Sequence, residues 1–216
     1  MTDSIVDRLR LALEDDLGSE RLRAALDAGT YPDPSFVPVL IERCALEPDF
    51  SVRETLTWAL MRHPADLTLP LLLDAVASGG PQAQSQALHT LSKIGDARGW
   101  SAMPPELLHS ADDEIARSAW RAAVLLVPDA ERAALATELV AELGPGERLR
   151  RSSLSRAIVA LEDAGMTALA PALGHPDDVV REHALATEVL ANDPDTGFEE
   201  AIYEAKKIVA LGTSAK

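Results

Sequence analysis

The chain has 216 residues, of which 47% are hydrophobic and only 4% aromatic, and its formal net charge is −15. This length suits one sizeable domain or a short repeat array, and a core filled by Leu, Ala and Val favours packed helices over a β-sandwich or barrel. The acidic balance argues against direct binding of nucleic acid, because phosphate binding depends on Lys and Arg. Most of the negative charge lies in residues 1–49 and 157–216.

The chain shows no sign of secretion or membrane insertion. Its single cysteine, Cys44, can form neither an intramolecular disulfide nor a zinc-type cluster. The N-terminus lacks the basic and then apolar segments of a signal peptide. The longest apolar run, residues 67–77, contains Pro70 and Asp74 and is too short to span a bilayer. We therefore expect a soluble, cytoplasmic protein that has no membrane contact.

Apolar segments of helical length run along the whole chain. Residues 4–15 and 20–28 predict two helices that cap the N-terminal end within residues 1–30. Five further stretches, each long enough for one helix, lie at residues 36–44, 67–76, 100–108, 133–143 and 168–173. A last helix over residues 198–211 predicts a C-terminal cap within residues 195–212. No stretch shows the strict alternation of a half-buried strand.

A second kind of helix alternates with these five stretches and repeats. In residues 83–94 the apolar side chains of Ala83, Ala87, Leu91 and Ile94 form one stripe of an amphipathic helix, and Gly95 provides its end. Equivalent stripes begin at Val52, Ala83, Ile115, Leu149 and Val180, at intervals of about 32 residues. Aspartates before several of these stripes are suited to cap a helix N-terminus.

The alternation of the two kinds of helix predicts the fold class. One helix pair cannot bury its apolar face alone, whereas stacked pairs share a continuous core. We therefore predict a single all-α domain over residues 1–216, a right-handed α-solenoid (superhelix) of about five helical hairpins. The hairpins occupy residues 33–193 and lie between the two helical caps.

The repeat resembles a known family. The segment over residues 83–100, which contains Lys-Ile-Gly-Asp, resembles the repeat of the HEAT superfamily, especially the bacterial HEAT-like type also seen in phycobilin lyases. Two copies match its pattern, through Asp49, Val52, Arg53 and Leu60 and through Asp177, Val180, Arg181 and Ala184. Two copies depart, with Ala116 in place of the arginine and Ser153 in place of the alanine. The chain also looks like actinobacterial HEAT-repeat proteins that occur alone or joined to MerR-type regulators.

The resemblance implies a concave groove lined by the second helix of each hairpin. Side chains two and six positions after the start of each stripe should then face the groove. They are Glu54, Trp58, Ser85, His89, Arg117, Arg121, Arg151 and Ser155, followed by Glu182 and Ala186. Trp and Arg are typical of binding hot spots, so this row predicts a site for an acidic or aromatic group.

A structural interpretation of the same row stays open. Trp58 and Trp120 can instead be core residues between repeats. The arginines, among which Arg156 is a further candidate for the groove, can instead pair with local acids such as Glu114 and Glu147.

No pattern of residues indicates catalysis, a metal or a cofactor. None of His63, His89, His109, His175 and His183 lies four residues from another, and none is followed by Glu, as in the HEAT-type iron hydroxylases. The glycines at residues 79–80 and 144–146 lack the strand and lysine of a phosphate-binding loop. We therefore expect neither catalytic residues nor cofactors.

The predicted function is a non-enzymatic interaction or scaffold protein that binds a protein, a peptide or a small acidic ligand in its groove. A sensor or effector component of a transcriptional regulator system is an alternative that rests on the resemblance. A HEAT-like DNA alkylpurine glycosylase is another, but such an enzyme needs a basic groove, and this chain has only a small arginine patch. The sequence indicates neither the partner nor the oligomeric state.

Overall fold

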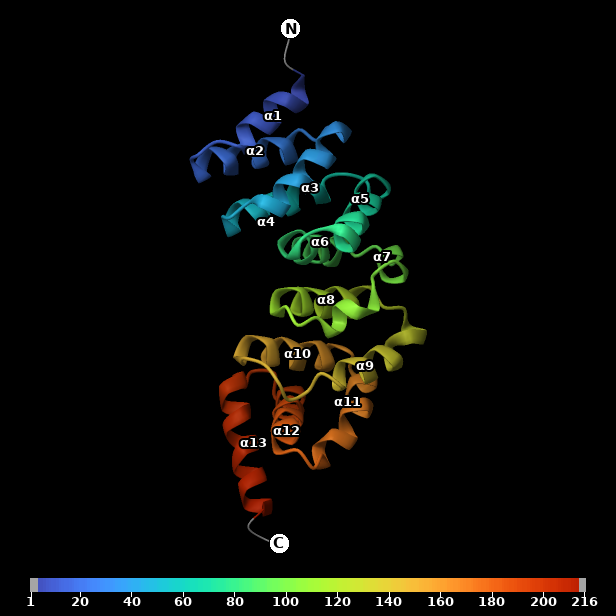
Figure 1. Cartoon of the computed structure of the whole chain (residues 1–216). Coiled ribbons are helices and arrows are strands. Elements are labelled where there is room, and N and C mark those ends of the chain that lie inside the picture. The colour runs from blue at the N-terminus through green and yellow to red at the C-terminus, as the bar shows by residue number, and fades with distance from the viewer. Residues whose placement is uncertain (1–3, 214–216) are drawn as a thin grey trace. The chain divides into compact units, whose positions relative to one another are not determined.

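The computed structural model describes residues 4–213, in which all regular structure is helical. The all-α prediction is therefore confirmed. The chain divides into two compact units, residues 1–107 and residues 108–216, and each unit is a row of packed helical hairpins (Figure 1). The helices that were predicted from the five stripes are α4, α6, α8, α10 and α12.

In the first unit, the even-numbered helices α2, α4 and α6 pack side by side, and α1, α3 and α5 pair with them. The helices are α1 (Ile5–Leu13), α2 (Gly18–Thr30), the short η1 (Pro34–Phe36), α3 (Val37–Leu46), α4 (Phe50–Met61), α5 (Ala65–Ser78), α6 (Pro81–Ile94) and α7 (Arg98–Ser101). The pair α1 and α2 is thus a hairpin of the same kind as the repeats.

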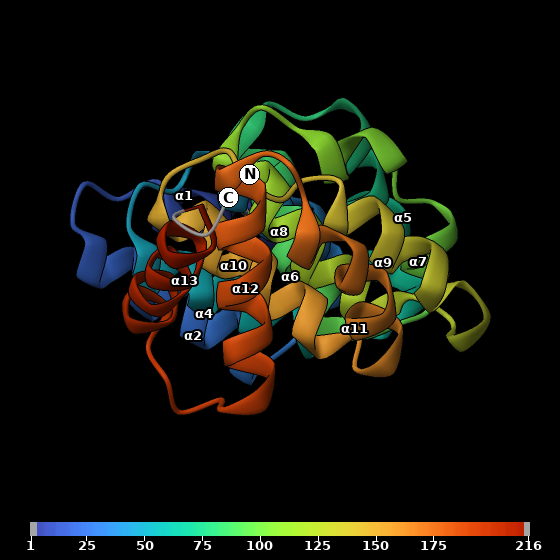
Figure 2. The ribbon, with the colours of Figure 1, turned by 90° about the horizontal axis from the view of Figure 1, so that it is seen from below.

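The second unit has three layers. Its helices are α8 (Asp113–Leu126), η3 (Asp129–Glu131), α9 (Arg132–Val140), α10 (Arg148–Ala160), α11 (Asp163–Leu169), η4 (Ala170–Gly174), α12 (Asp178–Asn192) and α13 (Phe198–Thr213), and η2 (Pro105–His109) precedes them. Helices α8, α10 and α12 form the middle layer, and α9 and α11 cover one side (Figure 1). Helix α13 packs against α12 on the other side, as the end-on view also shows (Figure 2).

Aspartates begin three of the repeated helices, as their positions predicted. The carboxylate of Asp49 accepts hydrogen bonds from the backbone of Ser51 (2.7 Å) and Val52 (3.2 Å) at the start of α4. Asp112 and Asp177 cap α8 and α12 in the same way. Because each cap satisfies backbone N–H groups that the first turn leaves unpaired, it sets the point where the helix begins.

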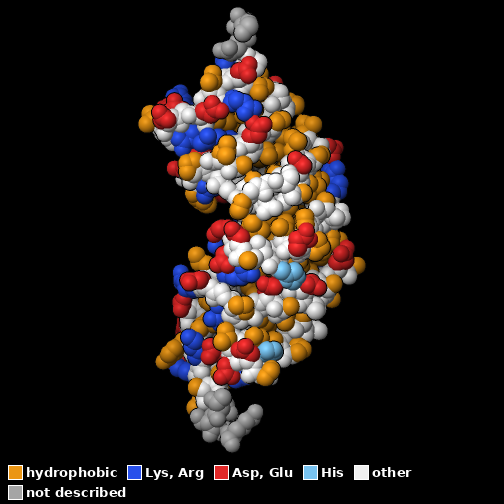
Figure 3. Space-filling view, viewed as in Figure 1, with side chains coloured by type: hydrophobic (Ala, Val, Ile, Leu, Met, Phe, Trp, Pro, Cys, Tyr) orange, Lys and Arg blue, Asp and Glu red, His pale blue; other side chains and the backbone are white. Residues whose placement is uncertain are grey.

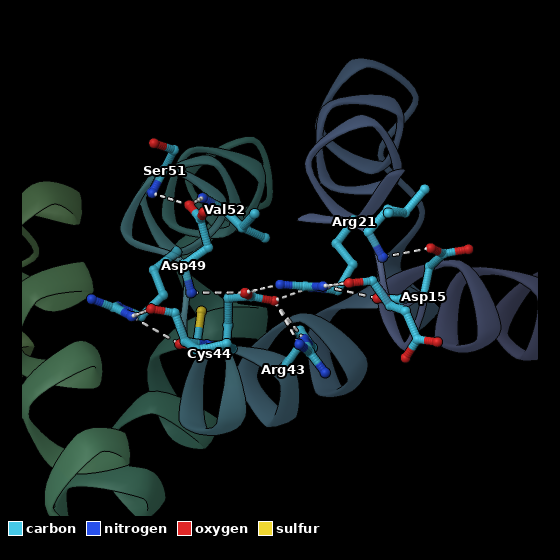
Figure 4. A network of polar contacts seen from close by, with 12 residues as sticks. Asp15, Arg21, Arg43, Cys44, Asp49, Ser51 and Val52 are labelled. Atoms are coloured by element: carbon cyan, nitrogen blue, oxygen red, sulfur yellow. Dashed lines mark hydrogen bonds and ion pairs between the residues drawn. The ribbon is translucent and has the colours of Figure 1, made fainter. Parts of the chain in front are cut away.

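One buried residue, Glu47, joins four helices of the first unit. Glu47, which follows α3, has a fully buried side chain that accepts hydrogen bonds from Arg21 of α2 (2.8 and 2.9 Å) and Arg43 of α3 (2.6 and 2.9 Å) (Figure 4). Its backbone carbonyl accepts one bond from Arg53 of α4 (2.8 Å) and one from Gln82 of α6 (2.9 Å). The single turn at Glu47 therefore ties α2, α3, α4 and α6 together.

The surroundings of Glu47 keep it ionised. Burial by itself would raise the pKa of this carboxyl group, because a low-dielectric interior disfavours charge. The hydrogen bonds from Arg21, the Asp49 backbone and Arg43 outweigh that effect and lower the pKa of Glu47 to about 2. The network is thus a fully paired buried charge, which is the condition under which such a group is tolerated.

The stripe predicted in α10 is displaced by one residue. Leu149, its expected first member, is 57% exposed, whereas Arg150 is buried. The buried stripe continues through Leu154 and Ile158 and therefore begins at Arg150. The prediction followed the apolar character of Leu149, but the structure buries the neighbouring arginine instead.

Arg150 can be buried because its guanidinium has three hydrogen-bond acceptors and an aromatic neighbour. It donates to Asp113 (3.0 Å), to Glu142 (3.1 Å) and to the carbonyl of Ser110 (3.0 Å). It also lies over the ring of Trp120, 5.1 Å from the ring centroid. Trp120 is itself completely buried, and its indole N–H donates to the carbonyl of Leu108 (2.8 Å), so the core interpretation of this tryptophan is right.

Candidate functional site

In the first unit, the predicted site residues lie on α4 and α6 and are already engaged with their neighbours. The Glu54 carboxylate lies 2.8 Å from Nε2 of His89, which links the two helices. The Ser85 hydroxyl donates to the carbonyl of Gln82 (3.3 Å). Trp58 is 39% exposed, and one side of its ring lies against Gly29 of α2. Trp58 therefore belongs partly to the packing between α2 and α4 and partly to the surface.

In the second unit, the arginines predicted on α8 are placed as expected relative to the buried stripe. Arg117 and Arg121 lie two and six positions after the buried Ile115. Arg117 donates to Glu114 (2.7 Å) on its own helix and to the hydroxyl of Ser153 on α10 (3.1 Å). Arg121 is exposed. The pairing of Arg117 with Glu114 agrees with the alternative interpretation, but it leaves the guanidinium at the α8–α10 boundary.

On α10 the one-residue displacement changes which side chains lie on this face. Ser155, predicted to face a groove, is completely buried, so that prediction is wrong. The sixth position after the start of the stripe is Arg156 instead, and its side chain is exposed. The sequence pattern predicted Arg156 only as a further candidate for the groove.

Arg151 is likewise displaced, toward α12 and α13. Burial lowers the pKa of Arg151, while the nearby carboxylates of Glu182 on α12 and Glu199 on α13 act in the opposite direction. Its Nε and Nη2 atoms are buried without a hydrogen-bond acceptor among the residues described. Arg151 is therefore separated from the row that Arg117, Arg121 and Arg156 form.

A pocket of about 250 Å³ lies between α8 and α10, and we call it the arginine pocket. Its lining consists of Arg117, Arg121, Val124 and Leu125 from α8 and Ser153, Arg156, Ala157 and Ala160 from α10. Three of these side chains are cationic, none is acidic, and most of the others are aliphatic. Acidic and basic side chains are otherwise interspersed on the faces of both units in view (Figure 3). The arginine pocket is thus a local basic site in an acidic protein.

A buried polar bridge joins α10 to α12 and includes the histidine of the second unit that is most deeply buried. The backbone N–H of Gly144 donates to Nδ1 of His183 (3.0 Å), which places the imidazole proton on Nε2. Nε2 lies 3.0 Å from the carbonyl of Arg151 and 3.1 Å from the Ser155 hydroxyl. Ser155 lies 2.8 Å from the Thr187 hydroxyl, which donates to the carbonyl of His183.

The direction of these hydrogen bonds gives the bridge a structural role and excludes a catalytic Ser–His pair. Because Thr187 uses its proton on a carbonyl, Ser155 must donate to Thr187 and accept from His183. His183 therefore cannot take a proton from Ser155, as a general base would. Burial, and then the charge of Arg151, lowers the pKa of His183 to about 4, so the neutral ring is the stable form.

The first unit contains a related bridge at corresponding positions. The hydroxyl groups of Thr57 on α4 and Thr90 on α6 lie 3.2 Å apart, and Gln86 donates to Thr57 (2.9 Å). Thr90 donates to the carbonyl of Gln86 (2.9 Å), as Thr187 does to that of His183. In both bridges, one residue lies five positions after the start of the buried stripe of the first helix. Its partners lie three and seven positions after the start of the stripe of the next helix. The recurrence of polar residues at these stripe positions is the sequence signal for this feature, which the prediction of a groove left out.

The side chains of Cys44 and His109 lie outside the arginine pocket and the polar bridges. Burial raises the pKa of the Cys44 thiol to about 12, so the thiolate is scarce at neutral pH. His109 has both ring nitrogens near carboxylates, Glu142 (2.7 Å) and Glu138 (3.1 Å), and the hydrogen bond with Glu142 is the main cause of its raised pKa. Among residues 4–213, no group of three or more His, Cys, Asp or Glu side chains could hold a metal ion. None of the helices in the described part of the chain is both long and apolar enough to cross a membrane.

Comparison with known proteins gives distant structural likenesses. No protein-family model matches the sequence, and no curated protein matches it. The chain is similar to human deoxyhypusine hydroxylase in complex with glycerol, with 17% identity, coverage of 95% of this chain and 96% of that one, and a TM-score of 0.45. It is also similar to a designed armadillo repeat protein, with 15% identity, coverage of 87% and 100%, and a TM-score of 0.40. Its own helix packing makes this chain an all-α repeat protein, and membership of the HEAT family stays a prediction.

Proposed function

We propose that this chain is a non-enzymatic interaction protein whose arginine pocket binds an acidic group that lies beside an apolar one. The observation that carries the proposal is the lining of the pocket: Arg117, Arg121 and Arg156 around an aliphatic wall, with no carboxylate among the lining residues. A guanidinium offers a fork of N–H donors that matches a carboxylate or phosphate. The aliphatic wall from Val124, Leu125 and Ala157 suits an adjacent apolar group.

The dimensions and the fixed arginine favour a small part of a larger ligand. The volume of about 250 Å³ is below the range of about 300–1,000 Å³ for pockets that enclose drug-sized molecules. It is suited to one or two side chains of a protein or peptide, or to a small acidic ligand. Because Ser153 and Glu114 already hold Arg117 in place, binding there costs little side-chain entropy.

A titration with matched dipeptides tests this function. The probe is N-acetyl-Asp-Leu-amide, and its uncharged counterpart is N-acetyl-Asn-Leu-amide. In NMR spectra of the whole chain, we expect the acidic dipeptide to shift the methyl signals of Val124 and Leu125 much more than the neutral one. The double variant Arg121→Gln/Arg156→Gln should lose this response.

A second pair of exposed arginines provides the control. Arg23→Gln/Arg62→Gln removes the same charge from the first unit, where neither residue lines the arginine pocket. This variant should respond as the wild type does. Equal methyl shifts with the acidic and neutral dipeptides, or equal responses of the two double variants, would rule out an acid-binding site between α8 and α10.

A further inference from the structure

In the second unit, the repeat places the same stripe positions along each boundary between neighbouring second helices, and we call each such boundary a slot. Between α8 and α10 this slot is the arginine pocket, and the sixth positions of the two stripes, Arg121 and Arg156, both line it. The α10 side of the pocket also contains the third and seventh positions, Ser153 and Ala157. The next slot along the chain lies between α10 and α12. Its α12 side consists of His183, Ala186, Thr187 and Leu190, at positions three, six, seven and ten.

Helix α13 covers the α12 side of that second slot. Ala186 packs in one buried cluster with Ala201, Ile202 and Ala205 of α13, and Leu190 and Phe198 pack against the cluster. The Phe198 ring also meets the His183 ring edge-on, with centroids 6.0 Å apart. Two of the positions of α12 that correspond to the lining of the arginine pocket, Ala186 and Leu190, are therefore covered by an amphipathic helix of the same chain.

The contacts of α13 combine apolar burial with acidic groups. Its first turn contains Glu199 and Glu200, and Glu199 lies 3.4 Å from the guanidinium of Arg148 on α10. Its buried side chains, Ala201, Ile202, Ala205 and Val209, follow helical spacing. Helix α13 thus packs an apolar stripe on the second helix α12, with an exposed carboxylate of its first turn beside an arginine of α10.

We propose that the partner seated at the arginine pocket is an amphipathic helix of another protein, with carboxylates beside its apolar stripe, packed on α8 and α10 as α13 packs on α12. This inference rests on the proposed function and names its partner class. The sixth position is Ala186 under α13 but Arg121 and Arg156 in the arginine pocket. The partner helix must therefore have carboxylates beside its apolar stripe near its centre, at positions such as those where α13 has Lys206 and Lys207.

A second copy of α13 is a poorer occupant than a separate partner. In this chain the apolar stripe of α13 is already buried on α12, so it would have to leave that site before it could bind another copy. Helix α13 also has Lys206 and Lys207 in its central turns, and these cations would approach the arginines. The charge of the pocket therefore favours a helix without these lysines.

A designed peptide can test the proposal on the full chain. The probe is the sequence of residues 198–213 with the changes Lys206→Glu and Lys207→Glu, capped at both ends and labelled with fluorescein. Fluorescence anisotropy should show saturable binding. The charge-reversal variant Arg121→Glu/Arg156→Glu should weaken binding by about tenfold or more, because like charges then meet at the contact. The matched variant Arg23→Glu/Arg62→Glu should bind as the wild type does.

Two comparisons make the outcome decisive. The same peptide with an additional Ala205→Pro change cannot form a continuous helix, so it should lose binding if the helix is the recognised form. Equal binding of the proline peptide, or equal affinity of the two charge-reversal variants, would overturn the proposal. So would NMR shifts that are larger at Phe198 and Ala201 than at Val124 and Leu125, because the peptide would then be replacing α13.

Failure of this inference is distinguishable from failure of the proposed function. If the acidic dipeptide shifts the methyl signals of Val124 and Leu125 but the helical peptide does not bind, the acid-binding site stands and the helical partner is wrong. If neither ligand acts on the arginine pocket, both proposals are wrong.

Discussion

Glu47 shows how one buried charge can set the stability of several helices. The change Glu47→Gln keeps the shape of the side chain but removes the negative charge that Arg21 and Arg43 share. We expect the free energy of unfolding to fall by about 3–5 kcal/mol, because two arginines near the core lose their counter-charge. Urea denaturation measures this loss. The control Glu42→Gln breaks an exposed pair with Arg10 and should cost less than about 1 kcal/mol.

The same carboxylate predicts acid sensitivity with a defined sign. Its pKa is lowered from the usual 4.5 to about 2, so its contribution to stability is complete above pH 4.5 and is lost as the pH falls toward 2. The unfolding free energy of the wild type should therefore decline more steeply over this range than that of Glu47→Gln. Parallel profiles would show that Glu47 does not keep its pairing in solution.

His183 predicts a second acid effect, at higher pH. Its folded pKa is lowered from 6.5 to about 4, so folding favours the neutral ring, and the contribution present above pH 6.5 is lost as the pH falls toward 4. The loss should reach about 3 kcal/mol, since each pKa unit corresponds to about 1.4 kcal/mol. The physical reasons are burial of the ring and the positive charge of Arg151. A protonated Nδ1 could also no longer accept the Gly144 N–H.

The substitution His183→Gln isolates this effect, because Gln86 fills the corresponding place in the first unit. Glutamine can donate to Ser155 and accept from Gly144, so the variant should fold at pH 7 and lose the decline between pH 6.5 and 4. Subtracting the two unfolding profiles also removes the contribution of His109, which has the opposite sign because its pKa is raised. An unchanged decline in the variant would contradict the assignment.

At the scale of elements, the packing of α2 on α4 depends on one glycine. A Cβ atom at Gly29 would lie only 2.2 Å from the Trp58 ring. Alanine is the better helix former by about 1 kcal/mol, so helix propensity alone predicts that Gly29→Ala stabilises the protein. We expect the opposite, a loss of about 1–3 kcal/mol from overpacking.

The double variant Gly29→Ala/Trp58→Ala separates these two effects. Relative to Trp58→Ala alone, the added alanine at position 29 should be neutral or stabilising, because the ring with which it collides is gone. Thermal unfolding of the four proteins completes a double-mutant cycle. Additive changes would show that Trp58 does not lie against Gly29 in solution.

The comparison of α8 with α10 shows where hydrophobic periodicity predicts a helix face and where it does not. In α8 the predicted stripe of Ile115, Ala119 and Ala123 is buried. In α10 the pattern put Leu149 inside, but Arg150 is buried there by its acidic partners and Trp120. Periodicity uses the polarity of each residue type, whereas burial of a charge depends on partners that only the fold brings together.

The one-residue displacement of the stripe in α10 limited how much of the candidate site could be predicted from the sequence. Arg117 and Arg121 could be placed because the stripe of α8 is apolar throughout. Arg156 took the place predicted for Ser155, and Arg151 turned toward α12. The polar bridges were unforeseen for a related reason, since the hydroxyl groups of Ser155 and Thr187 meet only when α10 and α12 pack.

At the scale of the whole molecule, the recurrence of helical hairpins is the feature that the sequence predicts best. The hairpins recur along the chain, and the α4–α6 and α10–α12 pairs use related polar bridges at the same stripe positions. In a repeat protein, stability is approximately the sum of such contacts between neighbours. The arginine pocket arises where a slot of the recurring pattern has Arg121 and Arg156 on its two sides.

The net charge of −15 indicates how the stability of the molecule should depend on salt. Self-repulsion of so many like charges destabilises the compact state. Raising NaCl from about 10 mM to about 150 mM shortens the Debye length from about 30 Å to about 8 Å, which screens this long-range repulsion more than the short ion pairs. We therefore expect the melting temperature at pH 7 to rise with salt.

Repeating the salt series near the sequence isoelectric point of about 4.7 provides the control. Net repulsion is small there, so the rise in melting temperature should largely disappear, although His183 and the other titrating groups lower the starting stability. If added salt lowers the melting temperature at pH 7, local pairs such as those of Arg150 outweigh the repulsion among the excess negative charges. Their screening would then be the dominant electrostatic effect on the folded chain.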